Sequence, residues 1–279
     1  MARLRFTKMH GIGNDYVYVD CFAASVADPA ALARRVSPRH TGIGSDGLIL
    51  IRPSDTADCR MEMYNADGSR GEMCGNGIRC VGKYVYDHGL VKRDTLRVAT
   101  DAGIKTLDLH IGDGRVQAVT VDMGEPLLDA PRIGMAAEGR VINAPLQVDE
   151  RTYQVTCVSM GNPHCVTFIA SVDGLPLTEI GPRFEHHAFF PKGVNTEVVQ
   201  VVSRTDLRMR VWERGSGETA ACGTGACAVL VAAVLNDKAD RRATVHLNGG
   251  DLEIEWNAAD NHVFMTGPAE EVFMGEIEV

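Results

Sequence analysis

The sequence predicts an α+β protein of two similar halves, each a curved and mostly antiparallel sheet around one central helix. Three observations lead to this prediction. Strand-like runs outnumber helix-like runs, several of those runs alternate with a period of two, and two helix-like runs follow the same Cys-Gly-x-Gly motif. Period-two alternation is typical of antiparallel strands with one solvated face. Because the helix-like runs are few and no β-α-β alternation is visible, a doubly wound parallel sheet is not expected.

A repeat in the sequence supports the two halves. The motif at Cys74 recurs at Cys222, 148 positions later, and other landmarks recur in the same register. These landmarks pair Asn14 with Asn162, Gly47 with Asn195, Tyr64 with Trp212, and Asn65 with Glu213. One register held on both sides of the cysteine predicts a duplicated domain. We expect one half to span residues 1–123 with a C-terminal strand over 266–279, and the other to span 124–265.

The individual elements follow from hydrophobic periodicity. Strands are expected over Tyr16–Val19, Leu48–Ile51, Met61–Tyr64, Val116–Val121, Val198–Val202, Leu207–Trp212 and Leu252–Trp256. Helices are expected over Pro29–Val36, Ile78–His88 and Ala226–Leu235. The last of these is apolar on every face, so it must be buried on every face. Each half therefore has a candidate central helix that starts at its own Cys-Gly-x-Gly motif.

Composition excludes several functional classes. The 279 residues carry 28 basic and 37 acidic side chains, a net charge of −9, and no Lys/Arg run, which argues against a nucleic-acid binder. The longest apolar run has ten residues, too short to cross a bilayer. The N-terminus has no apolar core typical of a secretory signal. The eight cysteines are then expected to stay reduced in the cytoplasm, and the nine histidines show no metal-ligand spacing.

The two Cys-Gly-x-Gly motifs are the strongest chemical signal. Each stands where a loop enters a helix, and the first turn of a helix has unpaired N–H donors and a partial positive charge. Such a place binds a carboxylate and favours a thiolate, so the cysteine pKa is expected to fall below its free value of about 8.5. A single copy would equally suit a structural cysteine at a tight turn. Two copies in one register favour two acid/base groups that act on opposite faces of one small molecule.

Several longer motifs together resemble diaminopimelate epimerase. They are Gly11–Asp15, Tyr64–Ser69, Glu72–Cys80, Gly161–His164, Trp212–Gly215 and Ala221–Ala226, in this order over most of the chain. The resemblance implies two pseudo-symmetric barrel-like α+β domains, usually in a homodimer. It also implies a two-base epimerase without a cofactor that converts LL-diaminopimelate to the meso form, in lysine and peptidoglycan precursor synthesis.

The resemblance further implies roles for individual residues. Cys74 and Cys222 would be the catalytic pair, and His164 and Glu213 would set the thiol pKa values. Substrate contacts would come from backbone amides and polar side chains: Asn14, Gly47, Asn65, Gly75, Asn76, Asn162, Asn195, Glu213, Arg214, Gly223 and Thr224. The residues themselves agree with this, because asparagines supply both donors and acceptors and Arg214 offers a planar fork for a carboxylate. No metal is implied.

Two alternatives remain open at this point. A related cofactor-free isomerase such as a proline racemase is one, although that family has a histidine in its first motif where this chain has Asn76. A redox switch in which Cys74 and Cys222 form a disulfide is the other. Label exchange in deuterated water and substitution of either cysteine would separate these alternatives from the epimerase.

Overall fold

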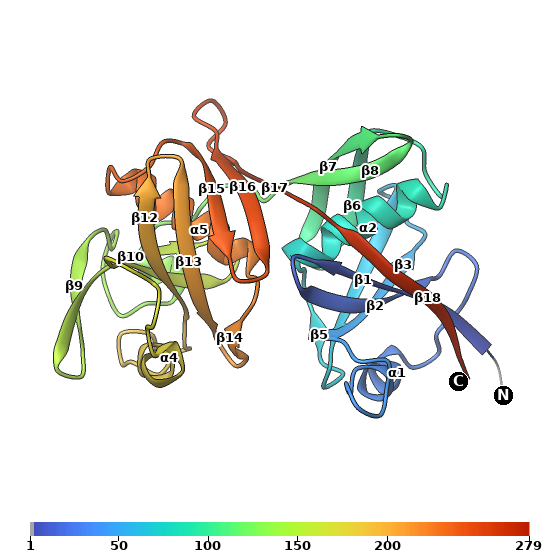
Figure 1. Ribbon diagram of the computed structural model, residues 1–279, viewed down its shortest axis with the longest axis horizontal. Helices are drawn as coiled ribbons and strands as arrows, with labels where there is room; N and C mark the ends of the chain where they lie inside the picture. Colours follow the sequence, from blue (N-terminus) through green and yellow to red (C-terminus); the bar gives the residue numbers. More distant parts are fainter. Residues whose placement is uncertain (1–2, 279) are drawn as a thin grey trace. The chain divides into compact units, whose positions relative to one another are not determined.

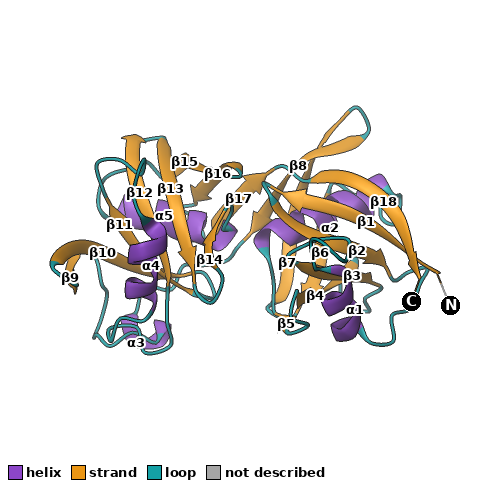
Figure 2. Cartoon of the chain, turned by 60° about the horizontal axis from the view of Figure 1, so that its bottom comes forward, coloured by secondary structure: helices purple, strands orange, loops and turns teal. Residues whose placement is uncertain are grey.

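The computed structural model describes residues 3–278, which form two compact units. The N-terminal unit comprises residues up to Val121 and from Thr266 onward, and the C-terminal unit comprises Asp122–Met265. Strands outnumber helices in each unit, and the helices lie beside them (Figure 2). The α+β class expected from the sequence is confirmed. Among the described residues, no helix has both the length and the apolar composition that a membrane span requires.

The N-terminal unit combines nine strands with two helices (Figure 1). In chain order they are β1 (Arg3–Gly11), β2 (Asn14–Asp20), α1 (Pro29–Val36), β3 (Gly47–Arg52), β4 (Cys59–Asn65), β5 (Arg70–Gly71), α2 (Gly75–Asp87), β6 (Thr95–Thr100), β7 (Gly103–Gly112), β8 (Arg115–Asp122) and β18 (Glu270–Glu278). Helix α2 packs against β1, β2 and β7, while α1 covers β3 and β4. The chain leaves this unit after Val121 and returns to it at Thr266.

The C-terminal unit repeats this plan. Its elements are α3 (Ala130–Ile133), β9 (Ala144–Val148), β10 (Arg151–Ser159), β11 (Pro163–Phe168), α4 (Leu177–Glu185), β12 (Asn195–Ser203), β13 (Asp206–Glu213), β14 (Gly217–Thr219), α5 (Gly223–Leu235), β15 (Arg242–Leu247), β16 (Gly250–Trp256) and β17 (Val263–Gly267). Helix α5 packs against β10, β11, β12, β15 and β16. Its residues from Gly225 to Ala233 are all buried, as its apolar sequence predicts.

Strand register confirms the duplication. In the N-terminal unit, β2 and β3 are parallel and Tyr16 lies opposite Gly47. In the C-terminal unit, β11 and β12 are parallel and His164 lies opposite Asn195. Both pairs obey the offset of the two cysteines, and so do the bounds of α2 and α5. The duplication therefore fixes which backbone positions correspond at the two helix entrances.

Two expectations about the helices were wrong. The sequence showed no β-α-β alternation, yet α1 and α2 each connect two parallel strands, and α4 and α5 do the same in the C-terminal unit. Helix α4 was missed because Pro182 stands inside it, and a proline usually ends a helical pattern. Adding the repeat offset of 148 positions to the residues of α1 would have located α4. Most other strand pairings are antiparallel, as expected.

The central helices also start earlier than expected. Helix α2 begins at Gly75 and not at Ile78, and α5 begins at Gly223 and not at Ala226. In each case the preceding cysteine is the N-cap residue, whose side chain accepts a backbone hydrogen bond in the first turn. The glycines of both motifs therefore lie inside the first helical turn, which leaves their N–H groups without intrahelical acceptors.

Candidate active site

The first helix entrance is built around Cys74, which caps α2 from an extended backbone with φ −129° and ψ 120°. Its Sγ accepts the Gly77 N–H at 3.3 Å, and its thiol donates to Asn14 Oδ1 at 3.2 Å. Asn14 begins β2, so the strand and the helix end meet at this hydrogen bond. The half-buried thiol thus has a partner on each side, a backbone donor and a carbonyl acceptor.

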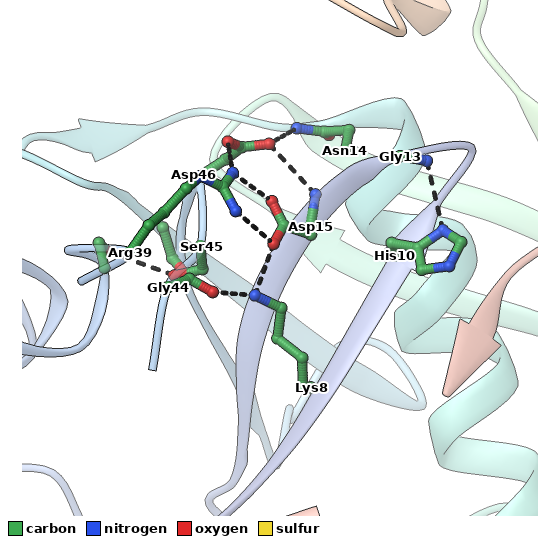
Figure 3. Close-up of polar contacts among 11 residues, drawn as sticks. Lys8, His10, Gly13, Asn14, Asp15, Arg39, Gly44, Ser45 and Asp46 are labelled. Carbon is green, nitrogen blue, oxygen red and sulfur yellow. Dashed lines mark hydrogen bonds and ion pairs between the residues drawn. The ribbon is translucent and has the colours of Figure 1, made fainter. Parts of the chain in front are cut away.

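Behind Asn14 lies a charged network drawn in Figure 3. The Asn14 Nδ2 donates to Asp46 Oδ2 at 2.7 Å, and the same oxygen accepts the Asp15 N–H at 3.1 Å. Arg39 donates to the other oxygen of Asp46 at 2.9 Å and to both oxygens of Asp15. Lys8 Nζ forms an ion pair with Asp15 Oδ2. Asp46 therefore holds the Asn14 side chain, and Asp46 is in turn held by Arg39 and by Asp15, which Lys8 contacts.

Burial and neighbouring charge shift the pKa values of the two carboxylates of this network in opposite directions. Burial opposes ionisation of Asp15, but hydrogen bonds from Arg39 and Lys8 outweigh it, so its pKa is lowered. Burial and the charge of Asp15 raise the pKa of Asp46. Asp15 is therefore the more firmly ionised of the two, and it anchors Arg39 and Lys8.

The second helix entrance is built around Cys222, which caps α5 with φ −132° and ψ 106°. Its Sγ accepts the Gly225 N–H at 3.3 Å and lies 3.6 Å from Thr224 Oγ1. Burial and the charges of Glu213 and Glu197 raise the pKa of this thiol well above its usual value, against the smaller opposing effect of Thr224 and Gly225. The expectation that the helix start lowers the cysteine pKa is therefore wrong for Cys222. Burial, together with the charges of two carboxylates, outweighs the hydrogen bonds of the first helical turn there.

His164 and Glu197 form a fully buried pair beside this entrance. The His164 Nδ1 lies 2.7 Å from Glu197 Oε1, and Nε2 lies 3.0 Å from Asn162 Oδ1. Both ring nitrogens therefore face side-chain oxygen atoms. Glu197 Oε1 also sits 2.7 Å from where a Cβ on Gly225 would be, so the pair lies directly against the first turn of α5.

Glu213 stands at the end of β13, next to the same thiol. Thr219 of β14 donates a short hydrogen bond to its Oε1. Burial raises the Glu213 pKa, although Thr219 and the charge of His164 act against this rise. Glu213 therefore acts on the Cys222 thiol both through its charge and through a side-chain hydrogen bond.

The other predicted contacts have mixed environments. Asn195 is buried, and its amide accepts from the Arg214 N–H at 2.9 Å and donates to Pro163 O at 3.1 Å. Its visible task is to hold Arg214 against β11. The Arg214 guanidinium donates to Lys192 O at 3.0 Å, and no carboxylate within residues 3–278 pairs with it. Asn65 donates to Ser69 Oγ at 2.9 Å.

Two more predicted residues belong to the N-terminal unit. A Cβ on Gly47 would lie 2.1 Å from Tyr64 O, so glycine is required there by close backbone approach. Asn76, in the first turn of α2, is 2% exposed, and its Oδ1 has no hydrogen-bond partner among the described residues. Gly75, Gly223 and Thr224 lie in the first turns of α2 and α5, where backbone N–H groups are available to an anion.

Sequence reasoning missed Asp46, Tyr16 and Glu197. The repeat offers a signal for Tyr16, because it aligns this residue with the predicted His164, and Glu197 stands only two residues after the predicted Asn195. Tyr16 is buried, and burial together with the charge of Cys74 raises its pKa. Asp46 follows a glycine-rich loop and gives no pattern of its own. Within the described part of the chain, no three potential metal-ligating side chains gather.

Comparison with solved structures defines the class of fold. A phenazine biosynthesis protein of the PhzF family from Bacillus anthracis matches with a TM-score of 0.73 and 14% identity over 100% of both chains. A probable proline racemase from Agrobacterium radiobacter K84 matches with a TM-score of 0.71 and 14% identity over 99% of this chain and 93% of that one. The protein therefore has the fold of the PhzF and proline racemase structures.

Sequence comparison is more specific. The family model for diaminopimelate epimerase matches residues 6–128 and 156–272. Diaminopimelate epimerases from Acetivibrio thermocellus and Desulfovibrio desulfuricans are each 57% identical, over 99% and 98% of this chain and the same shares of theirs. One from Methanococcus maripaludis is 54% identical over 99% of this chain and 100% of its own. The chain belongs to the diaminopimelate epimerase family.

Proposed function

We propose that this protein epimerises LL-2,6-diaminopimelate to meso-diaminopimelate without a cofactor, in the synthesis of lysine and peptidoglycan precursors. The observation that carries the proposal is the pair of cysteine-capped helix entrances, in a chain more than half identical to diaminopimelate epimerases over nearly its whole length. This activity needs two acid/base groups and an anion site, and each entrance supplies one thiol and one set of first-turn N–H groups.

In the proposed reaction, one thiolate takes the α-proton and becomes a thiol, while the other thiol gives its proton to the opposite face of the same carbon and becomes a thiolate. The stereocentre inverts and the two sulfur atoms exchange roles. Because negative charge spreads onto the α-carboxylate during proton removal, donors aimed at that carboxylate stabilise the transition state. We assign this task to the backbone N–H groups of Gly75, Asn76, Gly223 and Thr224.

The distal end of the substrate carries a second amino and a second carboxylate group. We propose that Arg214 and the asparagines Asn14, Asn65, Asn162 and Asn195 recognise it, with Glu213 facing the ammonium group and Gly47 admitting the substrate close to the backbone. Within residues 3–278 no carboxylate pairs with the exposed guanidinium of Arg214, which supports this assignment. His164 and Glu213 are proposed to set the pKa of Cys222. The charge of Glu213 on that thiol, and the charge of His164 on Glu213, support this assignment.

Label exchange tests the reaction. The purified protein is incubated with LL-diaminopimelate or with L-proline in deuterated water, and loss of the α-proton signal is followed by NMR. We expect deuterium to enter diaminopimelate together with formation of the meso isomer, and no label to enter proline. Label in proline but not in diaminopimelate would identify a proline racemase instead.

Substitution of each thiol tests the two-base assignment. Cys74→Ser and Cys222→Ser are each expected to lower kcat by about 10²–10⁴, the range for loss of a positioned acid or base. Cys80→Ser and Cys227→Ser are the matched controls, because these cysteines lie deeper in the same two helices. A Cys74→Ser protein that turns over at the parental rate would refute the assignment.

We further propose that the protein is a homodimer and acts in the cytoplasm, where its cysteines remain reduced. Strand β18 supports the first proposal, since it exposes three consecutive apolar side chains, Val272, Phe273 and Met274. Analytical ultracentrifugation of the wild type and of Phe273→Asp tests it. A monomeric wild type would contradict it, and cell fractionation tests the location.

A further inference from the structure

The orientation of the Asn14 side-chain amide is the starting point. A carboxamide presents a donor at one end and an acceptor at the other, whereas an ionised carboxylate only accepts. Asn14 Nδ2 lies 2.7 Å from Asp46 Oδ2, so the carboxylate of Asp46 requires the nitrogen end. The oxygen end is then turned toward the Cys74 Sγ at 3.2 Å.

This orientation has a direct consequence for the thiol. A carbonyl oxygen accepts a hydrogen bond from S–H but offers none to S⁻, so it stabilises the protonated form of Cys74. The corresponding asparagine of the C-terminal unit is used differently, because Asn162 turns its oxygen to His164 Nε2. The oxygens of the equivalent asparagines in the two units therefore face different partners, a thiol in one unit and a histidine ring in the other.

We propose that Asp46 is a positioning residue that holds Cys74 as a thiol in the ligand-free protein by fixing the Asn14 carboxamide. Asp46 can do this because it is itself fixed: the Asp15 N–H donates to the same oxygen at 3.1 Å, and Arg39 donates to the other oxygen at 2.9 Å. The inference rests on the proposed function only for the catalytic task of Cys74. The hydrogen bonds are present without substrate.

Other titratable groups face this thiol directly, namely Tyr16, Tyr18 and Cys80. The charged groups Lys8, Asp15 and Arg39 lie behind it, in the network around Asp46. A change at Asp46 could therefore act on Cys74 through its charge alone. The experiment must separate that direct effect from the effect through Asn14.

The test measures the pH midpoint of Cys74 alkylation by iodoacetamide in a Cys222→Ser background, with the modified peptide quantified by mass spectrometry. Asp46→Ala removes the acceptor that holds the Asn14 nitrogen, whereas an asparagine at position 46 could still accept with its own amide oxygen. The freed Asn14 amide can then donate its N–H to the thiolate, so the midpoint should fall by about one pH unit. Asn14→Ala removes the side chain that links Asp46 to Cys74, and in that background the same Asp46→Ala change should shift the midpoint less than half as far.

The outcomes are decisive in both directions. No shift for Asp46→Ala, or a shift in the Asn14→Ala background at least half as large, would overturn the proposal. If Asp46→Ala does not fold by circular dichroism, Asn14→Leu decides, because loss of the acceptor must itself lower the midpoint. No substrate is used, so failure of the epimerase assay leaves this measurement unaffected.

Discussion

The two helix entrances have the same backbone and different chemistry. Gly77 and Gly225 occupy the same position in the first turns of α2 and α5, and a Cβ on either would lie 2.7 Å from the side chain that packs below it. That side chain is Ile49 in the N-terminal unit and Glu197 in the C-terminal unit. Duplication thus fixed the geometry of a cysteine-capped helix, and substitution in the supporting strand gave each thiol its own environment.

The acidic residues near the two thiols also differ between the units. In the C-terminal unit Glu197 and Glu213 stand close enough to Cys222 to raise its pKa. In the N-terminal unit the acid Asp46 lies behind Asn14, and the position equivalent to Glu213 is the neutral Asn65. The comparison teaches that two thiols in equivalent positions need not titrate alike, which suits a reaction that requires one donor and one acceptor at a time.

The largest expected effect comes from replacing Glu197, which packs against the first turn of α5, by the residue that packs against the first turn of α2. Glu197→Ile introduces the residue of the N-terminal unit and leaves His164 buried without its carboxylate. Loss of one partner of a buried ion pair costs about 3–5 kcal/mol, and urea unfolding should show this loss. Adding His164→Tyr completes the exchange, because Tyr16 is the equivalent residue, and should restore most of the stability. A single variant as stable as the wild type would show that the pair contributes little.

A smaller effect is expected where the C-terminal unit has a charge that its counterpart lacks. Arg214 corresponds to Ala66, and within residues 3–278 its exposed guanidinium pairs with no carboxylate and donates only to Lys192 O. Arg214→Met should raise KM for diaminopimelate by roughly 10- to 100-fold, since a charged hydrogen bond is worth about 1.5–3 kcal/mol. Unfolding stability should change little, because the side chain is exposed. An unchanged KM would remove Arg214 from the substrate site.

The smallest expected effect concerns the pKa of Cys222. The charge of Glu213 raises that pKa, so Glu213→Gln should favour the thiolate and lower the pH midpoint of Cys222 alkylation by about one unit, which corresponds to about 1.4 kcal/mol. Asn65→Asp is the reciprocal variant, which adds the missing acid to the N-terminal unit and should raise the midpoint for Cys74. An upward shift for Glu213→Gln would contradict this account of the C-terminal entrance.

The sequence by itself determined the repeat, the α+β class, and the two cysteines at helix starts, because each depends on local pattern: residue spacing, periodicity and the turn chemistry of glycine. It also pointed to Glu213 through its register with Asn65, and to His164 through the Gly161–His164 motif. It could not locate α4, since Pro182 masks a helix that packing against β12, β13 and β14 stabilises.

Only the tertiary structure decided how each thiol is supported. Asp46 reaches Asn14 across 32 positions of sequence and His164 meets Glu197 across 33, and both contacts depend on the parallel pairing of strands that no local pattern specifies. The pKa of Cys222 is likewise a sum over burial and two carboxylates from different strands. Electrostatic environment is a property of three-dimensional proximity, so a sequence pattern that fixes the helix start leaves the protonation of its cysteine undetermined.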